Sequence, residues 1–156
     1  MKNCLICERI KLIQKTENNF FVKELSSGYV VLGDHQYYKG YTLLLSKIHT
    51  DELHKLKTGV RTQFLLDMAI TAEAVCKAFK PNKMNYELLG NTDSHLHWHI
   101  FPRYKNDPKP DVPIWIIPKS IRSSDKNIPS TAEILKLKEK LLIEINKLTE
   151  IKNSIC

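Results

Sequence analysis

Three histidines alternate with apolar residues in one short run, His95-Leu96-His97-Trp98-His99-Ile100-Phe101. Successive side chains of a β-strand point to opposite faces, so the run predicts a strand of a sheet that buries one face. Leu96, Trp98 and Ile100 would face the core, and the three imidazoles would share the other face. Histidine titrates near neutral pH and serves as base, acid or nucleophile, so this face indicates an active site.

The strand geometry limits the chemistry of these histidines. Neighbours on one strand face lie about 6.6 Å apart, which separates His95 from His99 by about 13 Å. A zinc–nitrogen bond is about 2.0–2.1 Å long, so one metal ion could bridge two of the histidines but hardly three. A cupin-like metal site would want a carboxylate soon afterwards, and the next acidic residue is Asp107. A reacting central imidazole, His97, fits better, with the metal site and an incidental surface strand as alternatives.

The remaining pattern predicts the fold class. Strands are expected at 20–25, 29–33, 41–46, 84–89 and 95–101, and an apolar stripe at helical spacing predicts a long helix over 60–79. The prolines of 106–129 predict an irregular arm. A capping box at 130–133 begins a C-terminal helix. Together they predict an α+β domain, an antiparallel sheet of about five strands with a helix laid across it.

The composition of the chain limits the kinds of molecule that it is expected to bind. The chain has 156 residues, 42% of them hydrophobic, which suits one globular domain. Its net charge of +7 suits anionic small molecules such as nucleotides. No basic stretch is interleaved with aromatic residues, so no nucleic-acid partner is expected. We also expect no membrane partner and a cytoplasmic location, because the apolar stretches are short and no leader pattern begins the chain.

Four cysteines suit a reduced protein rather than a disulfide framework. Cys4 and Cys7 form a CxxC pair that suits metal chelation or redox exchange. Cys76 lies in a helical pattern and is expected to be a buried small apolar residue, and Cys156 is expected to be incidental. The redox interpretation is disfavoured because no helix start is expected at the pair to lower a thiol pKa.

The histidine run resembles the signature of the histidine triad (HIT) family, His-φ-His-φ-His-φ-φ with φ apolar, at every position. The preceding stretch and the continuation Pro-Arg-Tyr look like the bacterial, diadenosine-polyphosphate-hydrolase-like branch; that stretch is Asn85-Tyr86-Glu87-Leu88-Leu89-Gly90-Asn91. The resemblance covers residues 1–115 as a HIT domain and implies a HIT-like fold and a homodimer. We expect 116–156 to form an arm and helix packed on the same domain.

The resemblance implies a nucleotide hydrolase or nucleotidyl transferase acting on the α-phosphate of an adenylate-type substrate. The substrate would be a dinucleoside polyphosphate or a nucleoside phosphoramidate. His97 would form a covalent nucleotidyl-histidine, with a backbone carbonyl fixing its other nitrogen, and His99 and His95 would assist. The chemistry itself needs no cofactor. The alternative is a non-catalytic nucleotide-binding or interaction protein stabilised by zinc.

The resemblance also assigns supporting residues. Asp34 would accept hydrogen bonds from ribose, and the phosphate would contact Asn85, Asn91 and Thr92. A structural zinc ion would bind Cys4, Cys7, His49 and His95, which competes with a role of His95 at the phosphate. Tyr41 stands where the family often has a fourth histidine, and its hydroxyl is a candidate substitute.

Overall fold

The computed structural model describes residues 4–154 and contains one sheet of five antiparallel strands in the order β1-β2-β3-β5-β4. The strands are β1 (Phe21–Glu24), β2 (Gly28–Leu32), β3 (Thr42–Ser46), β4 (Lys83–Glu87) and β5 (His97–Arg103). The predicted α+β fold is therefore confirmed. Strand β5 lies between β3 and β4, so its backbone is hydrogen-bonded along both edges.

Four helices accompany the sheet: α1 (Leu5–Gln14), α2 (Thr58–Phe79), α3 (Lys119–Arg122) and α4 (Thr131–Ser154). Three short 3-10 turns cover Leu53–Lys55, Ile114–Ile116 and Asp125–Asn127. Helix α2 ends where Lys80 adopts a left-handed conformation just before Pro81. Helix α4 begins with the expected capping box, because Ser130 and Glu133 exchange hydrogen bonds.

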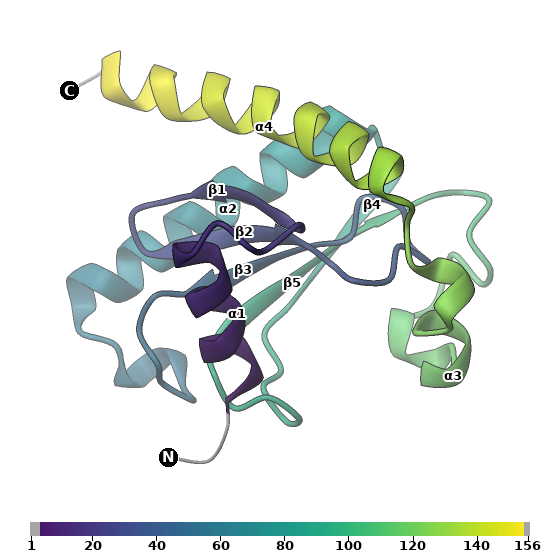
Figure 1. The fold of residues 1–156 in the computed structure, drawn as a ribbon, viewed down its shortest axis with the longest axis horizontal. Helices are drawn as coiled ribbons and strands as arrows, with labels where there is room; N and C mark the ends of the chain where they lie inside the picture. Colours follow the sequence, from purple (N-terminus) through teal and green to yellow (C-terminus); the bar gives the residue numbers. More distant parts are fainter. Residues whose placement is uncertain (1–3, 155–156) are drawn as a thin grey trace.

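One face of the sheet packs against α2 and α4, and α4 also contacts β1 (Figure 1). The core between these layers is apolar and includes Leu96 and Ile100, with Trp98 packed against it as the alternation predicts. Its fully buried members come from both layers: Val30, Leu32, Leu44, Phe64, Ala74, Val75, Ile100, Leu141 and Ile145. The apolar stripes of both helices thus find the partner surface that amphipathic helices require.

The opposite face of the sheet is covered only in part. Helix α1 packs Ile6 and Ile13 against Tyr29, Val31 and Leu45 of β2 and β3. Beyond α1 this face lies open between the helix and the segment that follows β5. That opening is where the histidines of β5 point.

The arm after β5 is folded back by one buried cation. Arg103 is 3% exposed and pairs with Asp107. Its guanidinium also donates to the carbonyl oxygens of Val112 and Lys109. Ile114, fully buried, then packs with Tyr38 and Phe101 in a separate small core. These contacts place 3-10 turn Ile114–Ile116 and α3 beside the open face of the sheet.

No helix between residues 4 and 154 combines the length and the apolar character that a bilayer span requires.

Candidate active site

Strand β5 begins at His97 rather than at His95, and this changes the predicted face. His97 and His99 point to the open side of the sheet and line a cavity of about 460 Å³. His95 precedes the strand, and its ring is buried away from that cavity. The three imidazoles therefore do not share one face; two face the cavity and the first turns elsewhere.

The backbone fixes the tautomer of His97. Its Nδ1 lies 2.6 Å from the carbonyl oxygen of His95, so Nδ1–H donates to that oxygen. A neutral imidazole with a proton on Nδ1 carries its lone pair on Nε2. Nε2 lies at the cavity, 3.0 Å from Nε2 of His99. The central histidine is thus held with a nucleophilic atom exposed to the cavity.

Tyr41 supports His99 from the side away from His97. Its hydroxyl lies 2.6 Å from Nδ1 of His99, and its ring stacks on Phe101 with centroids 4.0 Å apart. A Cβ at position 33 would lie 2.1 Å from the tyrosine ring, so Gly33 makes room for it. Burial raises the pKa of Tyr41 well above its ordinary value, which keeps the hydroxyl protonated as a donor.

These contacts define one direction of hydrogen bonding. Tyr41 donates to Nδ1 of His99, His99 donates from Nε2 toward His97, and His97 donates to the backbone. Burial, followed by the charges of His97 and Arg122, lowers the pKa of His99 to about 3. His99 is therefore a neutral donor near neutral pH, and an arriving phosphate anion would favour its protonation.

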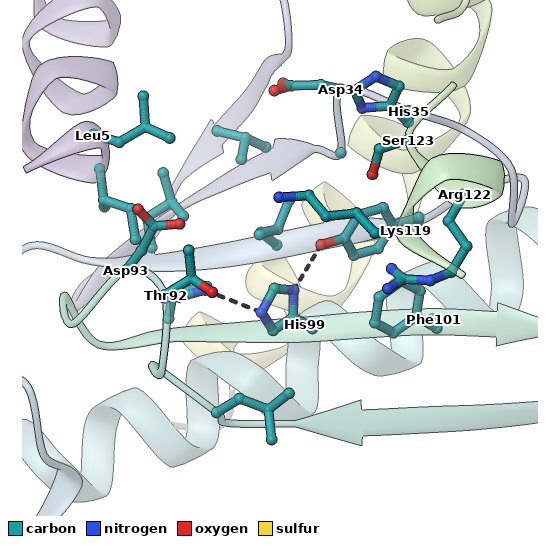
Figure 2. A pocket seen from close by; sticks show the side chains of 18 of the residues that line it. Leu5, Asp34, His35, Thr92, Asp93, His99, Phe101, Lys119, Arg122 and Ser123 are labelled. Carbon is teal, nitrogen blue, oxygen red and sulfur yellow. Dashed lines mark hydrogen bonds between the residues drawn. The ribbon is translucent and has the colours of Figure 1, made fainter. Parts of the chain in front are cut away.

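The loop before β5 and the end of β2 supply other walls of the cavity. Asn91 and Thr92 line it, as does Asp34, so three of the residues expected at the nucleotide lie together (Figure 2). Asp34 accepts hydrogen bonds from both terminal nitrogens of Arg9, one of them at 2.7 Å. Its carboxylate is thus already engaged by a cation from α1.

Asn85 occupies a different place. It pairs with Phe101 across β4 and β5, and its Oδ1 accepts a hydrogen bond of 2.9 Å from Arg103. It does not line the cavity. Within the structure its contact is with the cation that folds back the arm.

Several cavity residues are absent from the sequence-based expectation. Arg9 comes from α1, which the sequence analysis did not predict, and Trp115, Lys119 and Arg122 come from the arm. The Trp115 ring meets the His99 ring edge to face, with centroids 5.8 Å apart. The tryptophan inside the proline-rich stretch was the available sign that the arm contacts the site, because a large aromatic side chain usually packs against other residues.

A second cluster lies beside the histidine strand. Sγ of Cys4 and Cys7 and Nδ1 of His49 and His95 all lie within 4.8 Å of one another. Four of the distances are between 3.2 and 3.6 Å. A tetrahedral zinc ion with bonds of about 2.0–2.3 Å would separate its ligand atoms by about 3.3–3.8 Å. The donor set and its spacing fit that ion.

His95 is oriented for such a role. Its Nε2 lies 2.8 Å from the carbonyl oxygen of Ser46, so Nε2–H donates there and Nδ1 keeps a lone pair toward the cluster. Burial lowers the pKa of His95, which favours the neutral imidazole that a metal requires. The orientation agrees with a metal ligand rather than with a phosphate contact.

The position of the CxxC pair corrects one expectation. Cys4 is the N-cap of α1, and its Sγ accepts a hydrogen bond of 3.4 Å from the backbone of Cys7. The expected absence of a helix start at this pair is therefore wrong. However, burial raises the pKa of Cys7 rather than lowering it, so the helix start does not revive the redox interpretation.

The fold and the paired histidines define a protein of the histidine triad class. The HIT domain profile matches residues 14–106, more than half of the chain, so this protein belongs to the HIT family. It is 28% identical over 108 residues to Protein hit of Bacillus subtilis, an alignment covering 66% of this chain and 72% of that protein.

Solved structures show the same fold. A histidine triad protein from Marinobacter aquaeolei superposes with a TM-score of 0.70 at 22% identity, covering 82% of this chain and 89% of that one. A hypothetical histidine triad nucleotide-binding protein from Sulfolobus tokodaii gives 0.69 at 17% identity, covering 91% and 93%.

Proposed function

We propose that this protein is a nucleotide hydrolase or nucleotidyl transferase that attacks the α-phosphate of an adenylate-type substrate through His97. The single observation that carries this proposal is the state of His97, whose Nδ1 is tied to a backbone carbonyl while Nε2 lies at the cavity. A protein that only binds nucleotides needs no nucleophile held in this way. The substrate is a dinucleoside polyphosphate or a nucleoside phosphoramidate, and the resemblance to the bacterial branch favours the former.

The proposed reaction has two displacements. The lone pair on Nε2 of His97 forms a bond to phosphorus, and the bond between phosphorus and the leaving group breaks. The arriving phosphate anion favours the protonated form of His99, whose Nε2 lies 3.0 Å from that nucleophile, and this imidazolium gives its Nε2 proton to the leaving group and becomes neutral. Water then attacks the nucleotidyl-histidine, His99 takes up a proton from the water, and the nitrogen–phosphorus bond breaks. A nucleoside monophosphate leaves, and His97 returns to its neutral form.

The other residues bind and orient. Asn91 and Thr92 offer an amide and a hydroxyl to the phosphate oxygens beside Gly90, which adopts a positive φ of 75°. Asp34 releases Arg9 and then accepts hydrogen bonds from the ribose hydroxyls. The contact that the resemblance implies between Asn85 and the phosphate would require Asn85 to leave Arg103.

We further propose that Cys4, Cys7, His49 and His95 hold a structural zinc ion, and that the protein is a cytoplasmic homodimer. The zinc proposal is supported by the spacing of the four donors and by the hydrogen bond that frees Nδ1 of His95. Four protein ligands would fill the tetrahedral coordination of the ion and leave no open position for substrate, so the zinc ion would stabilise the fold. The dimer is what the family resemblance implies, and the location is the sequence-based expectation.

The proposed function is tested by incubating the protein with diadenosine tetraphosphate or adenosine 5′-phosphoramidate and separating the products by chromatography. We expect release of AMP and, after rapid acid-free quenching, a nucleotidyl adduct that mass spectrometry maps to His97. His97→Ala should lower turnover by at least about a hundredfold while keeping the thermal unfolding midpoint, since nucleophile removal acts on chemistry. Nucleotide binding without release of AMP in the parent protein would establish the non-catalytic alternative. Wild-type turnover in His97→Ala would refute the assignment of His97 as the nucleophile.

A further inference from the structure

The segment that follows the matched HIT domain forms one wall of the cavity. Trp115, Lys119, Arg122 and Ser123 line it, although the domain profile ends at residue 106. The segment is anchored rather than loosely attached, because Ile114 and Ile117 are buried. Figure 2 shows Lys119 and Arg122 on the side of α3 that faces His99. This wall therefore adds a second chemical surface to the site.

The wall carries two cations, and the one carboxylate held beside it is that of Glu87, which accepts a hydrogen bond from Trp115 and feels the charge of Arg122 without forming an ion pair with it in the described structure. Within residues 4–154 the structure shows no ion pair between a carboxylate and either Lys119 or Arg122. The third cation at the cavity, Arg9, is already paired with Asp34. The two cations of α3 thus remain available to an anionic ligand in the cavity.

Arg122 is held in position by its own contacts. Its Nε donates a hydrogen bond of 2.8 Å to the carbonyl oxygen of Ile117. Its guanidinium lies over the ring of Trp115, with the central carbon 4.5 Å from the ring centroid. The two terminal nitrogens are the donors left for a ligand, and a fixed guanidinium loses little entropy when it binds phosphate. The charge is close enough to His99 to contribute to its lowered pKa.

The geometry of displacement assigns these cations to one part of the substrate. Phosphoryl and nucleotidyl transfer place the attacking and leaving atoms roughly in line on opposite sides of phosphorus. The attacking atom belongs to His97 on β5, and the arm lies beside the same strand further along, with Trp115 against His99 and Phe101 and with Arg122 next to Phe101 (Figure 2). His99, the proposed proton donor to the leaving group, lies between His97 and Trp115, so the leaving group departs toward the wall that carries Lys119 and Arg122.

We propose that Lys119 and Arg122 form a subsite for the phosphates of the leaving group, so that this protein prefers polyphosphate leaving groups to amines. The inference rests on the proposed function, since it uses His97 as the attacking group. A polyphosphate leaving group carries several negative charges that two cations stabilise, whereas a departing amine carries none. The arm would thus select the substrate class while β5 performs the chemistry.

The kinetic test compares two substrates that share an adenylate and differ in the leaving group. Lys119→Gln is the cleaner variant, because this exposed side chain has no hydrogen bond in the described structure. We expect its kcat/KM to fall about tenfold for diadenosine tetraphosphate and less than about threefold for adenosine 5′-phosphoramidate, as for one charge-assisted hydrogen bond. Arg122→Gln should show the same bias. Lys126→Gln removes an equal charge from the exposed turn after α3, and its kinetics should match the parent.

An equal loss of kcat/KM for both substrates, or no loss for either, would overturn the proposal of a leaving-group subsite. A binding test separates this failure from failure of the proposed function. In His97→Ala, calorimetry should show affinity rising from AMP to ADP to ATP, and the rise should disappear in His97→Ala/Lys119→Gln. Equal affinity for the three nucleotides would refute the subsite alone. Absence of binding to all three would refute the proposed function.

Discussion

Tyr41→Phe isolates one hydrogen bond of the active site without disturbing its packing. The substitution keeps the ring that stacks on Phe101 and removes only the hydroxyl that lies 2.6 Å from Nδ1 of His99. The partner left behind is a largely buried acceptor, so we expect the free energy of unfolding to fall by about 1–2 kcal/mol. Urea denaturation followed by tryptophan fluorescence would measure this change.

The larger effect is expected on turnover. Without the donor at Nδ1, His99 no longer prefers the tautomer that presents Nε2–H toward His97. We expect kcat to fall about ten- to a hundredfold with KM changed less than about twofold, because substrate contacts stay in place. Unchanged kcat, or a loss confined to KM, would refute the proposed direction of hydrogen bonding.

A matched control removes a neighbouring hydroxyl that makes no hydrogen bond in the described structure. The hydroxyl of Tyr38 is buried, and it has no hydrogen-bond partner in the described part of the chain. Tyr38→Phe should therefore leave turnover unchanged and leave the free energy of unfolding equal or slightly higher, because an unsatisfied polar group is removed. A loss in Tyr38→Phe comparable to that in Tyr41→Phe would attribute both effects to general perturbation of the wall.

Two further predictions concern pH and metal. The pKa of His99 is lowered to about 3 in the folded protein, against about 6.5 when unfolded, so its stabilising contribution is full above about pH 6.5 and is lost as the pH falls toward 3. His99→Asn should remove about one proton from the pH dependence of unfolding between about pH 5.5 and pH 4, measured by urea denaturation, and an unchanged slope would contradict this. Mass spectrometry of metals should find about one zinc ion per chain, lost together with several degrees of the unfolding midpoint in Cys7→Ser. Cys76 is exposed on α2 rather than buried as the sequence predicted, so Cys76→Ser should retain both, and a parent protein without zinc would contradict the metal site.

The alternation in the histidine run predicted the buried face correctly but not the whole active face. Leu96 and Ile100 enter the core as expected because the period of a strand determines the side on which each residue lies. His95 departs from the pattern because the regular strand begins only at His97. The carbonyl of Ser46, far away in sequence, fixes the His95 ring instead. A local period cannot show where pairing stops.

The path of the arm and the presence of α1 could not be predicted from local sequence for a related reason. The prolines after residue 105 correctly indicated an irregular segment, yet its path depends on Arg103 donating to carbonyl oxygens of that segment. The arrival of Lys119 and Arg122 at the cavity is therefore a tertiary consequence of one buried cation. The CxxC pattern indicates metal chelation or redox exchange and gives no sign of helix α1, although Cys4 is also the N-cap of this helix.

His95 connects the two centres of this protein through three separate atoms. Its Nδ1 faces the cysteine pair, its Nε2 donates to Ser46, and its carbonyl oxygen accepts the proton of His97 Nδ1. We interpret the first histidine of the run as a structural residue that sets the tautomer of the second through the backbone. Loss of turnover in a His95 variant would therefore not establish a catalytic role, since such a change disturbs the metal cluster and the nucleophile together. Cys7→Ser separates these effects, because it alters the cluster and keeps the hydrogen bond from His95 Nε2 to Ser46 that positions the His95 carbonyl.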